Sequence, residues 1–292
     1  MKKMSKLLSL LAMLLLPVCL SAGLTVSVGA AVPDSIIIGS VTVNDGYYLK
    51  EGTTTPMSAK PTSGGYAYYK SGVLQLNNFD IQTTTTTNGI YTTIGDVIVE
   101  LVGANTIKTE KKGIYTQKGA LTVRGSGSLT ITATESDHGA YINSNCTIEG
   151  GTLNVTTTGA NANALYVEGS YTQKSGRVNL KSANRCLYTF GLSSLLGGAL
   201  TLDGCDSGSY PAWHTYGDIS ITNCDLTITS CAGTGISSDV AEKINVNING
   251  SAEIDIDADR TGIWCSQLTI SNVERLLVSS GSGYYALYTQ YL

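Results

Sequence analysis

GALTVRGSGSLTITA, residues 119–133, is the stretch that decides the fold. Apolar and polar side chains alternate in LTV and again in LTI, and Gly125 and Gly127 lie between the two runs. Alternation with period two over so few residues predicts two short β-strands joined by a tight corner. A glycine pair can also cradle a phosphate, but such a loop precedes a helix, and here a strand pattern follows.

The corner and its two strands recur along the chain. Gly125-Ser126 becomes Gly150-Gly151 in one copy and Asn272-Val273 in another, a variety that a corner tolerates and a phosphate loop does not. The aligned copies are VELVGANTIKT (99–109), LTVRGSGSLTI (121–131), CTIEGGTLNV (146–155), VNINGSAEIDI (246–256) and LTISNVERLLV (268–278).

A second phrase, of a small, an apolar and an aromatic residue, lies between these copies, and its successive first residues are 22 to 27 positions apart. Each unit then holds about three short strands and is too short to bury its own apolar face, so stacked units are required. The later copies are degraded. The nine are Gly89-Ile90-Tyr91, Gly113-Ile114-Tyr115, Gly139-Ala140-Tyr141, Ala164-Leu165-Tyr166, Cys186-Leu187-Tyr188, Ala212-Trp213-His214, Gly235-Ile236-Ser237, Gly262-Ile263-Trp264 and Ala286-Leu287-Tyr288.

The sequence therefore predicts an all-β fold, a right-handed parallel β-helix (solenoid) of about nine rungs over residues 76–292. Residues 32–75 are expected to form N-terminal cap strands, with a hairpin turn at Asn44-Asp45-Gly46. No cap sequence follows the last rung. Further domains, or a partner that pairs with this rung, are expected at the C-terminal end.

Residues 1–31 have the layout of a secretory signal peptide. Three lysines precede an apolar run, and small residues at Gly29-Ala30-Ala31 offer a cleavage site. A lipoprotein signal would use Cys19, but Val18 is bulkier than the residue such sites prefer. The mature chain is expected to be secreted, or held at the cell surface, and it has no further apolar stretch that could span a membrane.

The charge balance excludes one class of partner. The signal holds three of the 18 Lys and Arg residues and none of the 22 Asp and Glu residues, so the mature chain carries 15 − 22 = −7. Nucleic-acid binding needs clustered cations, so no nucleic-acid partner is expected.

The aromatic position of the second phrase is the predicted ligand site. Since the middle residue is apolar in all nine copies and points inward, alternation places the third residue outside. The small residues ahead of the tyrosines are expected to leave the rings uncovered, while Gln117 and Asn143 lie two positions further on. Tyrosine faces stack on sugar rings, and hydroxyl and amide groups bond to the sugar rim. The alternative is that stacked rings only stabilise the sheet. The predicted ladder is Tyr91, Tyr115, Tyr141, Tyr166 and Tyr188.

EIDIDADR, residues 253–260, places carboxylates on one strand face. Asp255, Asp257 and Asp259 could hold calcium, which takes oxygen ligands, and Arg260 beside them would suit a lyase. A solvated strand face is the simpler interpretation, because the aligned neighbouring rungs bring no acidic partner.

Six cysteines follow the signal, in an exported chain that permits disulfides. Cys205 and Cys224 each follow a corner residue, Gly204 or Asn223, and are predicted to be bonded, with the others free and buried. With no CxxC pair and only His138 and His214 available, neither a zinc site nor a Ser-His-Asp triad is expected.

The repeats, with YYKSGVLQLNNFDI (68–81) leading into GDVIVELVGANTI (95–107), resemble a secreted bacterial carbohydrate-binding β-helix family that is related in fold to pectate lyases. The resemblance covers roughly residues 36–292. It implies binding of plant polysaccharides, pectic ones included, but carries over no site signature.

These observations favour a secreted, non-catalytic β-helix that binds a polysaccharide along its side. No cofactor is required, and calcium is the cation that would bind if one does. The alternatives are a pectate-lyase-like enzyme, which needs acidic and basic residues gathered on one face, and a structural stalk or adhesin segment.

Overall fold

The computed structural model describes residues 32–83, 86–134, 138–204, 210–238 and 244–291. Val32–Leu292 forms one compact unit. The predicted signal peptide, residues 1–31, lies outside the described residues. Every described element is a β-strand, so no helix capable of crossing a membrane occurs in this part of the chain.

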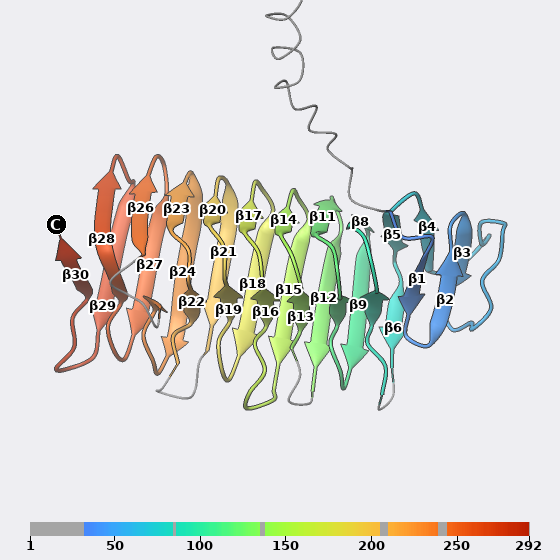
Figure 1. Ribbon diagram of the computed structural model, residues 1–292, viewed down its shortest axis with the longest axis horizontal. Coiled ribbons are helices and arrows are strands. Elements are labelled where there is room, and N and C mark those ends of the chain that lie inside the picture. Colours follow the sequence, from blue (N-terminus) through green and yellow to red (C-terminus); the bar gives the residue numbers. More distant parts are fainter. Residues whose placement is uncertain (1–31, 84–85, 135–137, 205–209, 239–243, 292) are drawn as a thin grey trace, which may run out of the picture. The chain divides into compact units, whose positions relative to one another are not determined.

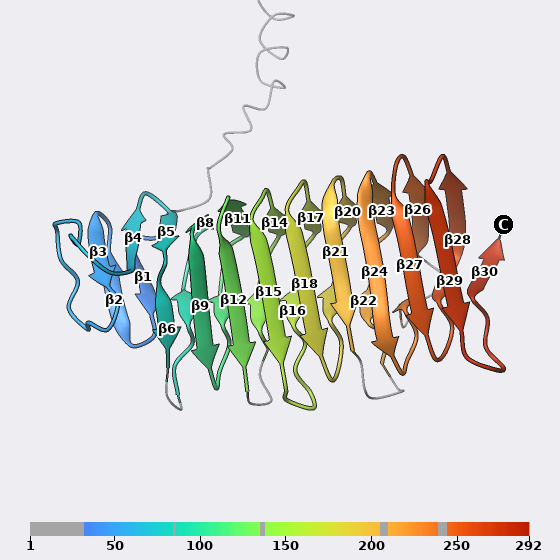
Figure 2. The same ribbon diagram turned by 180° about the vertical axis from the view of Figure 1, so that it is seen from behind.

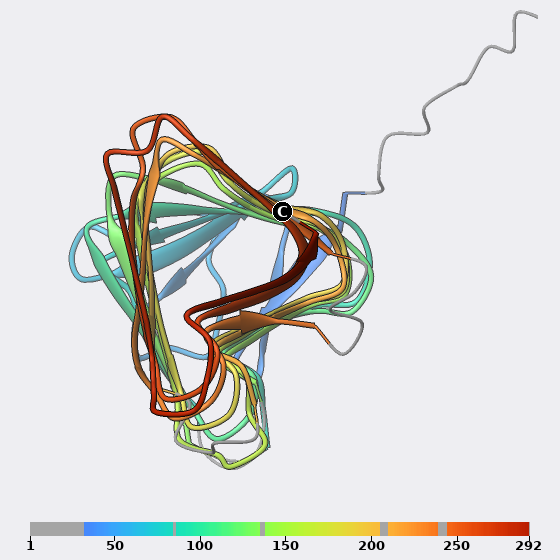
Figure 3. The same cartoon turned by 90° about the vertical axis from the view of Figure 1, so that its left-hand side faces the viewer.

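The unit is a parallel β-solenoid, as the repeats predict (Figure 1; Figure 2 shows the opposite side). Each turn contributes a strand to three columns, and successive turns superimpose in the view along the solenoid (Figure 3). Nine strands stack in the second column, which makes eight steps between neighbours, or about eight turns. The right-handed sense stays a prediction.

The first column contains the strands that end at the glycine corner. One of them, β28 (Ile263–Ser271), is long enough to begin in the third column, described below, and to continue into the first. The other members of the first column are β5 (Val73–Asn77), β8 (Val97–Val102), β11 (Leu121–Gly125), β14 (Cys146–Ile148), β17 (Tyr171–Gln173), β20 (Ser193–Leu195), β23 (Ile219–Thr222) and β26 (Asn245–Asn249).

The second column is a nine-stranded sheet on the other side of that corner. It consists of β6 (Asp80–Gln82), β9 (Ala104–Thr109), β12 (Ser128–Ala133), β15 (Thr152–Thr157), β18 (Arg177–Ser182), β21 (Gly198–Asp203), β24 (Cys224–Cys231), β27 (Glu253–Ala258) and β29 (Arg275–Ser280).

The third column carries the small-apolar-aromatic phrase. It consists of β7 (Ile90–Thr92), β10 (Ile114–Thr116), β13 (Ala140–Ile142), β16 (Leu165–Val167), β19 (Leu187–Thr189), β22 (Trp213–Thr215), β25 (Ile236–Ser237), the start of β28, and β30 (Leu287–Tyr291).

The stretch 119–133 forms β11, a corner and β12. Gly125 has φ +111°, and a Cβ there would lie 2.3 Å from the carbonyl oxygen of Leu101 in the turn below. The glycine is required because the backbones of successive corners approach too closely for a side chain. The inward side chains of β11 and β12, such as Val123 and Ile131, are fully buried in a core that runs the length of the solenoid.

Antiparallel strands precede the solenoid: β1 (Ser35–Ile38), β2 (Val41–Asn44), β3 (Tyr47–Lys50) and β4 (Tyr66–Lys70). β1 pairs with the third-column strand β7, and β4 pairs with the first-column strand β5. The chain turns at Asp45-Gly46, between β2 and β3, as predicted, but these two strands do not pair with each other, so the hairpin is wrong. β1 and β2 form the hairpin around Gly39, and β3 pairs with β4 instead. The capping role of these strands stays a prediction.

Candidate functional site

The structure brings the five predicted tyrosines into one row on the outer face of the third column. Tyr91, Tyr115 and Tyr141 pair in register, and Tyr166, Tyr188 and His214 continue the same row. The residue ahead of each, from Ile90 to Trp213, is fully buried. The tyrosines themselves are half-buried. The alternation that placed these rings outside is therefore confirmed. We call these six residues the aromatic column.

The rings of this column mostly stack on one another. Ring centroids are 5.2 Å apart for Tyr91 and Tyr115, and neighbouring rings are tilted by 16°. From Tyr141 to His214 the spacings are 4.6, 4.8 and 4.6 Å, with tilts of 12–14°. Only the step from Tyr115 to Tyr141 is edge-on. Each stacked face is covered by the next ring, so the outward surface consists of ring edges and hydroxyl groups.

Gln117 and Asn143 lie beside the column, as predicted, and they form hydrogen bonds there. The hydroxyl of Tyr91 donates to Oε1 of Gln117 at 2.7 Å, and Nδ2 of Asn143 donates to the carbonyl oxygen of Gln117 at 2.7 Å. The hydroxyl of Tyr141 donates to the carboxylate of Glu168, one turn on. Burial is the largest cause that raises the pKa of Tyr141 well above its ordinary value of 10.0, and the hydrogen bond to the Glu168 carboxylate is the next. This hydroxyl stays protonated and able to donate.

The sequence interpretation missed a second aromatic row beside the first. Phe190 and Tyr216 occupy the row of Gln117 and Asn143, and their rings stack at 5.0 Å with a tilt of 15°. His138, expected only as a turn residue, stacks on Tyr166 at 5.0 Å. The sequence did contain the pattern that predicts this second row, since Phe190 and Tyr216 each lie two residues after a position of the aromatic column. Cations also lie over the rings, Lys112 above Tyr115 at 5.1 Å and Arg185 above Tyr188 at 5.3 Å.

The small residues ahead of the column do not serve to uncover the rings, so that expectation is wrong. Gly89, Gly113 and Gly139 are buried. A Cβ on Gly113 would lie 2.2 Å from Cγ2 of Ile131, a core residue of β12. The position is small because a β-branched side chain of the second column and the carbonyl oxygen of the next turn, that of Gly139 at 2.6 Å, together fill the space.

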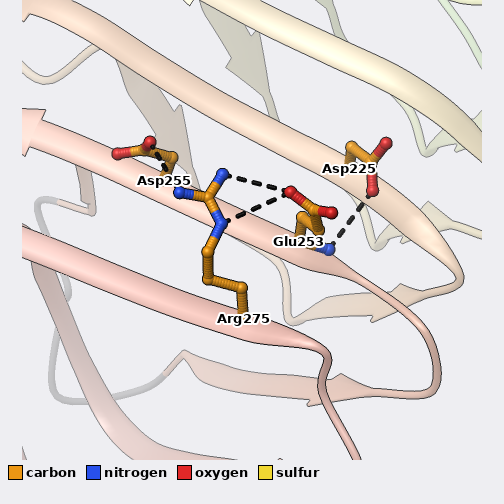
Figure 4. A network of polar contacts seen from close by, with 4 residues as sticks. All are labelled: Asp225, Glu253, Asp255 and Arg275. Carbon is orange, nitrogen blue, oxygen red and sulfur yellow. Dashed lines mark hydrogen bonds and ion pairs between the residues drawn. The ribbon is translucent and has the colours of Figure 1, made fainter.

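The carboxylates of β27 lie on the outer face of the second column (Figure 4). Arg275 of β29 donates to Glu253 at 3.1 Å and to Asp255 at 3.4 Å, and the Ser279 hydroxyl donates to Asp257 at 2.6 Å. A guanidinium group thus supplies the counter-charge that calcium would supply. Nowhere in the described ranges do three acidic, histidine or cysteine side chains gather as a metal site.

The predicted Cys205–Cys224 disulfide is wrong. Cys224 carries a free thiol that is fully buried, and burial raises its pKa to about 12. The register places Cys224 opposite Gly198, at the start of β21, whereas Cys205 follows the end of that strand and lies outside the described residues. Cys231, at the far end of β24, is disulfide-bonded, so the expectation that it is free is also wrong. Cys146 and Cys186 are free and buried, as predicted.

Comparisons with known proteins give no match: no family model, no curated protein and no solved structure is significantly similar to this chain.

Proposed function

We propose that this chain is an exported, non-catalytic β-solenoid that binds a polysaccharide along its aromatic column. The observation that carries the proposal is the continuous row of half-buried rings from Tyr91 to Tyr188, which the buried His214 continues, with hydrogen-bonding side chains beside it. One row of similar groups at the strand spacing of about 4.8 Å suits an extended, repeating ligand better than a compact one.

The stacking limits how such a ligand can be held. Because the ring faces cover one another, a sugar chain would contact ring edges and the tyrosine hydroxyls, and would bond to Gln117, Asn143 and Glu168. Phe190, of which 40% is exposed, adds apolar surface at one end of the row. This mode depends on hydroxyl groups more than on ring faces, which makes it testable by removing single oxygen atoms.

Export is part of the proposal, supported by the signal layout of residues 1–31 and by the disulfide at Cys231. Disulfides persist in oxidising compartments and are rare in the cytosol. The resemblance to secreted carbohydrate-binding β-helices and the right-handed sense belong to the same proposal.

Binding is favoured over the lyase alternative by where the charges lie. The carboxylates of β27 are on the second column, where Arg275 pairs with Glu253 and Asp255, while the aromatic column is on the third. The acidic strand that suggested calcium-assisted lyase chemistry therefore lies away from the proposed sugar track.

Replacement of Tyr115, Tyr141 and Tyr166 by Phe tests the proposal. The triple variant keeps the rings but loses three hydroxyls, so we expect several-fold weaker retention on insoluble cellulose, xylan or pectin, whichever retains the wild type. Stability should change little, because a net hydrogen bond contributes only about 0.5–1.5 kcal/mol. The Y48F/Y68F variant is the matched control, since these two rings also stack, at 4.1 Å, but lie on the N-terminal strands.

Retention of the triple variant equal to that of the wild type would remove the aromatic column from the proposal. A wild type retained by no polysaccharide, with or without chelator, would overturn the function itself and favour a protein-binding stalk. Release of unsaturated, ultraviolet-absorbing products would establish the lyase alternative.

A further inference from the structure

The aromatic column is interrupted near the C-terminal end of the solenoid. Ile236 pairs with Ile263, so the next residue of each strand, Ser237 and Trp264, occupies the column position. Ser237 carries no ring, and Trp264 pairs with Tyr288 in the last strand. Two aromatic positions are thereby separated from the stacked part of the column.

The rings beyond the interruption have open faces. Trp264 meets Tyr288 edge-on, at 5.6 Å and 77°, and Tyr285 is tilted by 49° against Tyr288. These side chains are well exposed: 42% of Trp264, 63% of Tyr285 and 39% of Tyr288. No pair among them is stacked in parallel, in contrast with the rings from Tyr141 to His214. Their faces are available to a ligand.

These rings line a cavity of about 340 Å³. Arg260, Thr234 and Tyr284 complete its wall, together with Thr261 and Gly283. The lining contains no Leu, Ile, Val or Met side chain, so it offers aromatic faces and hydrogen-bonding groups rather than a purely apolar surface. Arg260 is its one charged residue and lies over the Tyr284 ring at 6.0 Å.

Hydrogen bonds fix the backbone that carries Tyr284 and Tyr285. The amide of Gly262 donates to the carbonyl oxygen of Tyr285 at 3.1 Å, and the amide of Tyr284 donates to Gly281 at 3.2 Å. The Ser280 hydroxyl donates to the carbonyl oxygen of Tyr284 at 3.1 Å.

We propose that this cavity is a second saccharide site, which binds one pyranose ring of an oligosaccharide by stacking it on Trp264 and Tyr285. A pyranose has an apolar face and a polar rim, and the cavity matches both, with rings for the face and with Arg260, Thr234 and tyrosine hydroxyls for the rim. An apolar peptide anchor fits less well, because the lining has no aliphatic pocket for it. The inference rests on the proposed carbohydrate binding and assigns ring stacking to this cavity rather than to the aromatic column.

Tryptophan fluorescence gives a direct readout. The chain has two tryptophans, and Trp213 is fully buried, so a collisional quencher such as acrylamide reaches Trp264. We expect hexasaccharides of cellulose, xylan or polygalacturonate to shield Trp264 from quenching in the full chain. The W264A/Y285A variant lacks this reporter, so its binding is measured by titration calorimetry, as for wild type; it should be at least about tenfold weaker, given what an aromatic stacking platform contributes. Y47A is the matched control, because Tyr47 is 40% exposed and lies on β3.

The R260Q variant distinguishes the sources of the pyranose. If R260Q weakens binding of only the polygalacturonate hexamer, Arg260 binds a uronate carboxylate. If it weakens binding of all three hexasaccharides equally, Arg260 binds ring hydroxyls. Both results support the site. Hexasaccharides that bind without shielding Trp264, and bind W264A/Y285A as they bind wild type, overturn this inference and leave the proposed function intact. Binding of no saccharide by the wild type overturns both, and shielding by a tyrosine-rich peptide alone would assign the cavity to a protein partner.

Discussion

At the scale of single residues, the small position ahead of the aromatic column shows how tightly the columns pack. The clash of a Cβ on Gly113 with Ile131 has counterparts in other turns, where Gly89 faces Ile107 and Gly139 faces Val155. The register places Leu180 at the next step of the second column, and the small position there is Ala164. A leucine branches one carbon further out than isoleucine or valine, so alanine is accommodated.

Replacement of Gly113 by Ala is therefore expected to destabilise the protein by about 1–3 kcal/mol, the usual cost of overpacking. The measurement is the free energy of unfolding in guanidinium. The double variant G113A/I131L should recover part of this cost, because it relieves the contact with Cγ2 of Ile131 but leaves the one with the carbonyl oxygen of Gly139. I131L alone is the control. No loss in G113A, or no recovery in the double variant, would contradict this explanation.

At the scale of elements, neighbouring first-column strands are linked by alternating charges on their outer face. Glu100 of β8 pairs with Arg124 of β11 at 2.9 Å, and Glu149, just after β14, pairs with Lys174, just after β17, at 2.9 Å. The side-chain amide of Gln75 donates to Glu100 at 2.8 Å. This hydrogen bond is the largest cause that lowers the pKa of Glu100, and Arg124 adds to it. Such pairs support the parallel register, but exposure keeps each contribution below about 1 kcal/mol.

The lowered pKa of Glu100 predicts a pH dependence. A carboxylate with a folded pKa below its ordinary value of 4.5 stabilises the protein above that pH, and this stabilisation is lost as pH falls through the lower folded pKa. We expect E100Q to have a lower Tm than wild type at pH 7, by the equivalent of up to about 1 kcal/mol. The difference should shrink below pH 4.5. A difference that is constant from pH 7 to pH 3 would show that Glu100 acts through packing alone.

At the scale of the whole solenoid, the two ends are unlike. At the N-terminal end, β1 and β4 pair with β7 and β5, the first strands of their columns. At the other end the last turn contains inward residues such as Leu276 and Val278 that are only half-buried. In a stacked fold each turn is stabilised by its neighbours, so the last turn has the weakest support.

Hydrogen exchange should reveal this asymmetry. We expect amides of β28 to β30 to exchange at least about tenfold faster than those of β12 and β15 in the centre, whereas β7 and β8 remain protected. Peptide-resolved mass spectrometry measures all three regions in one experiment, with the central turns as internal reference. Uniform protection along the solenoid would contradict nearest-neighbour stabilisation. Added hexasaccharide should slow exchange around Trp264 and Tyr285 if the cavity is occupied.

The repeat by itself determined the parallel solenoid, the inward and outward faces and the row of tyrosines. These follow from alternation and turn residues among consecutive positions, and a one-residue error would have placed the aromatic column in the core. Tertiary structure alone decided that the column's ring faces are mostly closed, that Arg275 pairs with Glu253 and Asp255, that Cys224 is free and that Trp264 lines a cavity. Each of these depends on side chains from different turns, whose distances and ring angles are set by packing between turns and leave no periodic trace in the sequence.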